Sequence, residues 1–187
     1  MNVYEKCPIL ENNYFMLRYV QDKDAEELLK VYSDIKSVPI FNSDNCNGDI
    51  FYYTTLERMK QQIRFWDEEY KKKYYVRWSI IDKKTSSVIG TIELFNRKAS
   101  DFFNNCGLLR LDLRSDYEKN DQIVKILEII IDNAYNLFNC NLIATKAIST
   151  ATERIKALTK CGFTYSDEKL IGHDGAIYND YYIIKNN

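Results

Sequence analysis

The chain has 187 residues, a length typical of one domain with a sizeable core, and we expect a single domain over residues 1–187. Its formal net charge of −1 excludes the basic surface that nucleic-acid binding requires, and no apolar run approaches the ~18 residues of a membrane span. One histidine and five cysteines without a C-x-x-C pair predict no metal site and indicate reduced thiols in the cytoplasm.

Hydrophobic periodicity and turn residues predict eleven elements in the order β-α-α-β-β-β-α-β-α-β-β. In chain order they cover residues 14–20, 24–34, 54–70, 74–82, 88–95, 108–113, 121–138, 142–148, 152–163, 163 onward and 176–185. The two strands at 74–95 are joined by a short polar turn and read as a hairpin. Residues 36–53 and 96–107 are polar connections without a regular period.

Helix starts and stops follow from capping residues. Thr54 and Glu57 form a capping-box pattern that opens the second helix, and Thr150 or Thr152 is expected to cap the fourth. Gly162 ends that fourth helix at a position that needs a positive φ.

The segment from residue 108 to residue 138 organises the rest of the chain. Its strand alternates, with Leu109, Leu111 and Leu113 on one face and Arg110, Asp112 and Arg114 on the other. A polar turn leads into a long amphipathic helix that starts near Asp121, whose side chain is expected to cap the first free amides. A tight turn between a strand and a helix leaves N–H groups free, an arrangement that binds phosphates.

This strand, turn and helix resemble the GNAT N-acetyltransferases, in which a Gln/Arg-x-x-Gly-x-Gly/Ala turn holds the pyrophosphate of acetyl-CoA. On this chain the pattern falls on residues 118–123 and departs from it, with Glu118 for Gln/Arg, Asp121 for Gly and Ile123 for Gly/Ala. The first strand and helix, the 74–95 hairpin and the Gly162-Phe163 ending of the late helix also resemble the family, most closely its ribosomal-protein N-terminal branch.

The resemblance implies an α/β (α+β) GNAT fold, a mixed, splayed central sheet of about seven strands flanked by helices. Acyl-CoA would enter a V-shaped gap beside residues 108–113. The implied function is transfer of an acetyl group from acetyl-CoA to a primary amine of a small molecule or of a peptide or protein N terminus. The alternative is a catalytically inactive GNAT-fold binding or interaction module, which the altered turn favours. The sequence identifies no amine acceptor and leaves a homodimer open.

The resemblance also implies the cofactor-binding residues. Backbone groups of Leu111, Asp112 and Leu113 would hold the pantetheine arm of acetyl-CoA as an added strand does. The pyrophosphate would lie on the turn formed by Lys119, Asn120, Asp121, Gln122, Ile123 and Val124. Because the Asp121 carboxylate would compete for the same amides and repel phosphates, we expect weak binding of CoA.

Glu93 is the candidate catalytic residue, since a carboxylate in this part of the hairpin accepts the amine proton in some relatives. The alternative is a solvated strand carboxylate without a role in the reaction. Two further positions depart from the family: Ala151 stands where many members have Asn, and Leu158 stands where many have the Tyr that protonates the leaving thiolate. Tyrosines of the last hairpin could replace that Tyr or serve in packing: Tyr165, Tyr178, Tyr181 and Tyr182.

Overall fold

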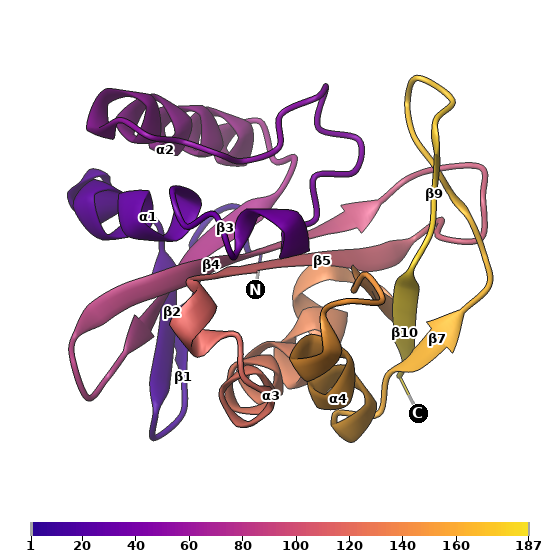
Figure 1. Cartoon of the computed structure of the whole chain (residues 1–187). Coiled ribbons are helices and arrows are strands. Elements are labelled where there is room, and N and C mark those ends of the chain that lie inside the picture. The colour runs from indigo at the N-terminus through magenta and orange to yellow at the C-terminus, as the bar shows by residue number, and fades with distance from the viewer. Residues whose placement is uncertain (1, 187) are drawn as a thin grey trace.

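A computed structural model describes residues 2–186, which form a central mixed sheet with two helices on each face (Figure 1). Helices α1 and α2 cover one face, and α3 and α4 cover the other. The helices are α1 Ala25–Tyr32, α2 Leu56–Lys71, α3 Asn120–Phe138 and α4 Thr152–Lys160, with short 3-10 turns η1 Asp22–Asp24, η2 Val38–Ile40 and η3 Ser115–Tyr117.

Within the described residues the main sheet has eight strands in the order β1-β2-β3-β4-β5-β6-β10-β7. Their bounds are β1 Leu10–Glu11, β2 Phe15–Tyr19, β3 Val76–Asp82, β4 Ser87–Arg97, β5 Cys106–Leu113, β6 Leu142–Lys146, β7 Thr164–Ser166 and β10 Tyr181–Lys185. A separate two-stranded hairpin is formed by β8 Leu170–Ile171 and β9 Ile177–Tyr178. The predicted neighbours in the sheet are therefore confirmed: the β3–β4 hairpin, β5 and β6 follow one another.

The sheet opens between β5 and β6. These two strands are parallel and pair only over the first part of β5, from Gly107 with Ile143 to Leu109 with Thr145. Further along, Leu111 and Leu113 pair only with β4, on the other side of β5. The β6-facing edge of residues 111–113 thus leaves the ladder, which is the splayed sheet that the resemblance to the GNAT N-acetyltransferases implies.

Alternation along β5 divides its side chains between two layers, as predicted. Leu109, Leu111 and Leu113 pack in one core with the apolar stripe of α3. The opposite core contains buried side chains of α1 and α2, among them Tyr32 and Trp66. Because both faces of β5 are covered, all eight of its residues are buried, polar ones included.

Several local details differ from the sequence prediction. The N-cap of α2 is Thr55 instead of Thr54, with its side chain accepting from the Arg58 amide at 3.2 Å. Helix α3 begins after Lys119, and its N-cap has no side-chain hydrogen bond, so Asp121 does not cap the helix. Helix α4 follows Ala151, also without a side-chain cap, so neither predicted threonine caps it. Strands β1, β8 and β9 were not predicted as separate strands, because two residues are too few to show a period.

Two predicted helix ends are confirmed. Asn139 ends α3 with φ of 47°, and Gly162 follows α4 with φ of 91°.

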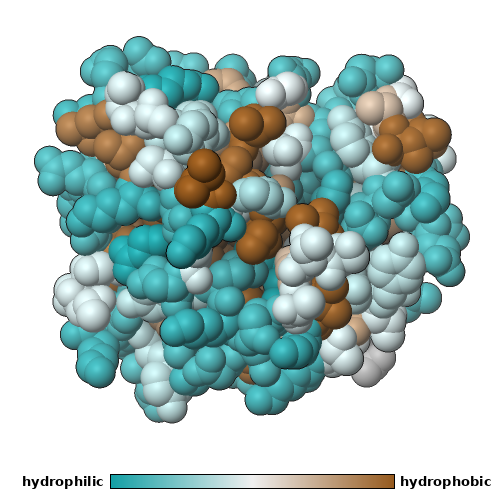
Figure 2. All heavy atoms as spheres, viewed as in Figure 1, coloured by the Kyte–Doolittle hydropathy of each residue, from teal (hydrophilic) through white to brown (hydrophobic). Residues whose placement is uncertain are grey.

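Figure 2 shows hydrophobic atoms on the viewed face in small separate groups, one of them near the β8–β9 hairpin. None of the helices in residues 2–186 combines the length and apolar character needed to cross a bilayer.

Candidate active site

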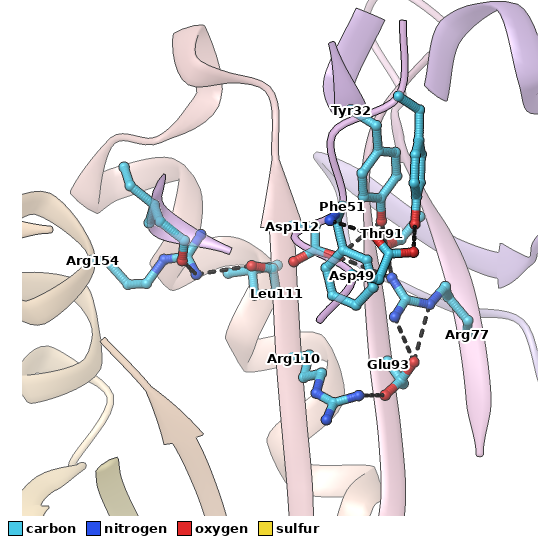
Figure 3. Close-up of polar contacts among 12 residues, drawn as sticks. Tyr32, Asp49, Phe51, Arg77, Thr91, Glu93, Arg110, Leu111, Asp112 and Arg154 are labelled. Atoms are coloured by element: carbon cyan, nitrogen blue, oxygen red, sulfur yellow. Dashed lines mark hydrogen bonds and ion pairs between the residues drawn. The ribbon is translucent and has the colours of Figure 1, made fainter. Parts of the chain in front are cut away.

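Three neighbouring strands contribute paired charged residues to one buried ladder. Arg77 of β3 lies opposite Glu93 of β4, and Glu93 lies opposite Arg110 of β5. Glu93 Oε2 accepts from Arg77 Nε at 3.1 Å and also from Nη2, and Glu93 Oε1 accepts from Arg110 Nη1 at 2.9 Å. Figure 3 shows both guanidinium groups directed at the carboxylate between them. With 1% exposure, Glu93 is not the solvated carboxylate considered as the alternative.

A second carboxylate, Asp112, completes the ladder next to α1. Its Oδ2 accepts from Arg77 Nη1 at 2.9 Å and from the Tyr32 hydroxyl at 2.8 Å. Thr91 lies beside them, with its hydroxyl 2.7 Å from that of Tyr32. Arg77 also stacks over the Trp66 ring, 4.4 Å from its centroid. Asp112 therefore has a polar network around its side chain in the sheet–helix interface, in addition to the backbone role predicted for it.

The two carboxylates differ in their proton affinity. Burial would raise the pKa of Glu93, but the guanidinium groups of Arg77 and Arg110 outweigh burial and hold this pKa below its ordinary value. For Asp112 burial dominates over Arg77 and Tyr32, and its pKa is raised. Glu93 is therefore a stable anion, whereas Asp112 binds a proton more readily than an ordinary aspartate.

The Arg77–Glu93–Arg110 row faces a cavity of about 1050 Å³. Its walls combine aromatic side chains, among them Phe51, Trp66, Phe95, Tyr75 and Tyr181, with many polar and charged ones, and they include the single histidine, His173. A concave space that combines aromatic walls with polar groups able to orient a ligand is typical of small-molecule sites. The cavity is the candidate acceptor site.

Asp44, in the connection between α1 and α2, holds one side of this cavity together, and sequence reasoning missed it. Its carboxylate accepts from Lys146 Nζ at 2.7 Å and from the Tyr181 hydroxyl at 3.0 Å, and its carbonyl accepts from Arg110 Nη2 at 2.8 Å. The residue joins a loop to three different strands. No local pattern in the Asn-rich connection indicates this role, because every partner is far away in sequence.

Further along β5, past the residues that line the cavity, the open edge of the strand meets a buried arginine of α4. Arg154 Nη1 donates to the Leu111 carbonyl at 2.8 Å, as Figure 3 shows. The same guanidinium holds the Glu118 carboxylate through Nε and Nη2, both at 2.7 Å. Arg154 thus occupies the strand edge along which the resemblance implies a pantetheine arm.

The turn at the start of α3 commits most of its amides to the protein itself. The Asn120 amide donates to the Glu153 carboxylate at 3.1 Å, and the amides of Gln122 and Ile123 donate to the Lys119 carbonyl. Ile123 and Val124 place their side chains in the core. Lys119 and Asp121 are exposed.

The expectation that Asp121 occupies the helix amides is wrong. Its carboxylate accepts from Gln122 Nε2 at 2.9 Å and lies 3.8 Å from Lys125 Nζ, with a side-chain exposure of 62%. The reason is that Lys119, two residues earlier, is the N-cap, so Asp121 is the second residue of the helix and its side chain is directed outward. The first amide of α3 is instead satisfied by Glu153 of α4.

Comparison with known proteins decides the family. The family model of the acetyltransferase (GNAT) domain matches residues 15–164, most of the chain. The chain belongs to the GNAT family. A curated relative, the uncharacterised N-acetyltransferase YoaA of Bacillus subtilis, is 28% identical over 85 residues, which cover 46% of this chain and 44% of YoaA. The aligned part is thus less than half of that relative.

Solved structures share the GNAT fold at low sequence identity. RimL, a ribosomal-protein α-N-acetyltransferase in complex with CoA, has a TM-score of 0.70 at 10% identity over 95% of this chain and 98% of that one. A ribosomal-protein alanine acetyltransferase of Vibrio fischeri has a TM-score of 0.68 at 18% identity over 94% of both chains. MccE, a self-immunity acetyltransferase in complex with acetyl-CoA and AMP, has a TM-score of 0.69 at 15% identity over 94% of both.

Other residues that the resemblance to the GNAT family singled out are placed as follows. Ala151 and Leu158 are both buried and apolar. Among the hairpin tyrosines, only Tyr181 reaches the cavity and is fully buried, while Tyr165 and Tyr182 stack on each other with ring centroids 5.5 Å apart. Tyr178 lies in the short β8–β9 hairpin.

Proposed function

We propose that this GNAT protein transfers an acetyl group from acetyl-CoA to a primary amine that binds in the 1050 Å³ cavity. The observation that carries the proposal is that β5 takes part in two features: Leu108 and Arg110 line the cavity together with the buried Glu93, and Leu111–Leu113 lie beyond the point where β6 leaves the strand. Membership of the GNAT family supports the same reading. The five cysteines are free thiols, so we assign the activity to the cytoplasm.

Some groups of the proposed acetyl-CoA site are free to bind the cofactor, and others are engaged by the protein itself. The unpaired edge of residues 111–113 offers backbone groups for the pantetheine arm, and the exposed Lys119 offers a cation near the turn for the pyrophosphate. The Leu111 carbonyl and the Asn120 amide, however, are engaged by Arg154 and Glu153. When bound, the cofactor would supply an acetyl thioester that an amine can attack.

Glu93 is the proposed proton acceptor, acting directly or through water. A carboxylate has about four lone-pair sites, and three N–H groups of Arg77 and Arg110 use three of them, so one acceptor site stays free. Because its low pKa makes Glu93 a weak base, its proposed contribution is to hold the water through which the amine proton passes on to solvent.

The proposal is tested in two steps. Calorimetric titration with CoA measures binding, and release of free CoA thiol measures acetyl transfer to a panel of amino acids, polyamines, aminoglycosides and peptides. We expect binding of CoA and transfer to at least one of these amines. Glu93→Gln should lower turnover by ~10²-fold with little change in CoA affinity, measured at a temperature where the variant is folded.

The inactive binding module is the second reading, because Arg154 and Glu153 engage groups that the cofactor needs. It predicts that neither CoA nor acetyl-CoA produces heat or raises the melting temperature. Binding of CoA without transfer to any amine would also favour it, whereas turnover of one amine would exclude it.

A further inference from the structure

The Glu118–Arg154 pair lies where two parts of a cofactor would meet. Arg154 is 2% exposed and reaches three places at once: the Leu111 carbonyl on the open strand edge, the Ile40 carbonyl of η2 at 3.3 Å, and both oxygens of Glu118 at the start of the turn. The guanidinium therefore stands between the strand edge proposed for pantetheine and the turn proposed for the pyrophosphate.

A buried guanidinium requires an anion, because its desolvation is otherwise uncompensated. Glu118 provides that anion in a bidentate geometry, and its own side chain is only 8% exposed. A phosphate group presents the same pattern of acceptor oxygens to the arginine fork as a carboxylate does. The Glu118 carboxylate thus binds the Arg154 guanidinium at the place where a phosphate of the cofactor could bind.

No other cation near the turn is placed in this way, within residues 2–186. Arg114 is engaged by the Asp116 carboxylate at 2.6 Å and stacks over the Tyr117 ring, 5.2 Å from its centroid. Lys119 is exposed and offers only a solvated ammonium. The glycines that let a backbone approach the pyrophosphate are replaced at this turn, so a side-chain ligand is the remaining way to bind it closely.

Resting on the proposed function, we propose that Arg154 is a ligand of the cofactor pyrophosphate and that Glu118 holds it until the cofactor binds. On binding, the guanidinium leaves both the Leu111 carbonyl and Glu118, which frees the strand edge for the pantetheine arm. Glu118 then turns to solvent. The pair makes the affinity for CoA depend on an exchange of one anion for another on the same arginine.

The test is calorimetry with two probes, CoA and pantetheine, which lacks the phosphates. The variants are Arg154→Gln and Glu118→Gln, with Lys160→Gln as the matched control, because Lys160 is an exposed cation at the end of the same helix. Arg154→Gln should weaken CoA binding by ~10-fold or more, since a charge-assisted bidentate contact is lost, and should leave pantetheine binding unchanged or tighter. Glu118→Gln should tighten CoA binding by ~10-fold because the competing anion is removed. Lys160→Gln should change neither.

The proposal is overturned if Arg154→Gln binds CoA as tightly as the wild type, or weakens CoA and pantetheine equally. Because loss of a buried cation can unfold the chain, the wild type gives an independent readout: the nitrogen-15 resonance of Arg154 Nε, assigned with Arg154→Lys. It should shift with CoA, and an unchanged resonance at saturating CoA overturns the proposal. If the wild type and Glu118→Gln bind neither CoA nor pantetheine, the proposed function fails together with the proposed role of Arg154.

Discussion

Glu93→Gln is expected to destabilise the fold strongly, because it removes the shared anion of two buried guanidinium groups. Arg77 keeps Asp112 as a counter-ion, whereas Arg110 keeps only the neutral Asp44 carbonyl. Removing one partner of a buried ion pair costs about 3–5 kcal/mol. For a chain of this size such a loss lowers the melting temperature by roughly 6–20 °C.

Asp112→Asn is the matched comparison, since it removes one negative charge from the same network. The folded protein already disfavours this charge, because burial raises the pKa of Asp112. We therefore expect Asp112→Asn to cost less than Glu93→Gln at neutral pH. The comparison separates the effect of charge from the effect of disturbing the buried interface, which both substitutions share.

The two costs should change with pH in opposite directions. The pKa of Glu93 is lowered by folding, so its contribution is complete above its unfolded pKa of about 4.3 and is lost as the pH falls through the folded value. The cost of Glu93→Gln should therefore shrink on acidification. The pKa of Asp112 is raised, so the wild type gains stability relative to Asp112→Asn as the pH falls toward about 3.9, and that cost should grow.

Urea unfolding of the three proteins at a series of pH values from neutral to acidic measures both effects. Fluorescence of the buried Trp66 and Trp78 reports the transition, and the midpoints are compared at equal slope. Equal costs for the two substitutions at neutral pH, or a cost of Glu93→Gln that grows with acidification, would refute the reasoning. Either result would mean that Glu93 is not held as an anion by the two arginines.

Three further substitutions test local details. Thr55→Ala should lower the free energy of unfolding by about 1 kcal/mol through loss of the α2 cap, while Thr54→Ala should change it by less than about 0.5 kcal/mol. Equal losses for the two variants in thermal unfolding would contradict the assignment of Thr55 as the cap. Gly90→Ala should destabilise by about 2 kcal/mol or more, because a Cβ there would lie 2.2 Å from the Asp112 carbonyl oxygen; an unchanged melting temperature argues against this close approach. Asp121→Asn should change the Kd for CoA by less than about threefold, since an exposed charge is screened by salt, and a larger gain in calorimetry would show that the carboxylate faces the cofactor.

The sequence predicted the fold because its signals are local. Alternation in the 74–95 hairpin and in residues 108–113, and the stripe of three- and four-residue spacings in 121–138, each determine an element and its buried face. The caps were less accurate. Thr54 and Thr55 are both acceptable residues, and the backbone conformation that selects Thr55 depends on how the preceding loop enters the helix.

The charged part of the site depended on distant contacts. Glu93 was identified by its place on the hairpin, but its burial between two arginines follows from strand register. Arg154 was not identified, because it reaches Leu111 from 43 positions along the chain, and Asp44 meets Lys146 across 102 positions. No pattern of neighbouring residues encodes such pairs. Asp121 was misjudged for a related reason, since Glu153 of another helix supplies the capping carboxylate.

The short pairing between β5 and β6 also affects how the protein unfolds. Only three registered positions join β6 to the antiparallel strands β1–β5, whereas β6 pairs with β10 over five positions. We therefore expect strands β6, β10 and β7 to open together as one unit, joined to the rest of the sheet by the short β5–β6 ladder. Sub-global opening should begin at this seam, so amide protons of β6 exchange with solvent at a lower free energy than those of β3 and β4. The width of the gap beside Leu111 then depends on a seam of only three paired positions.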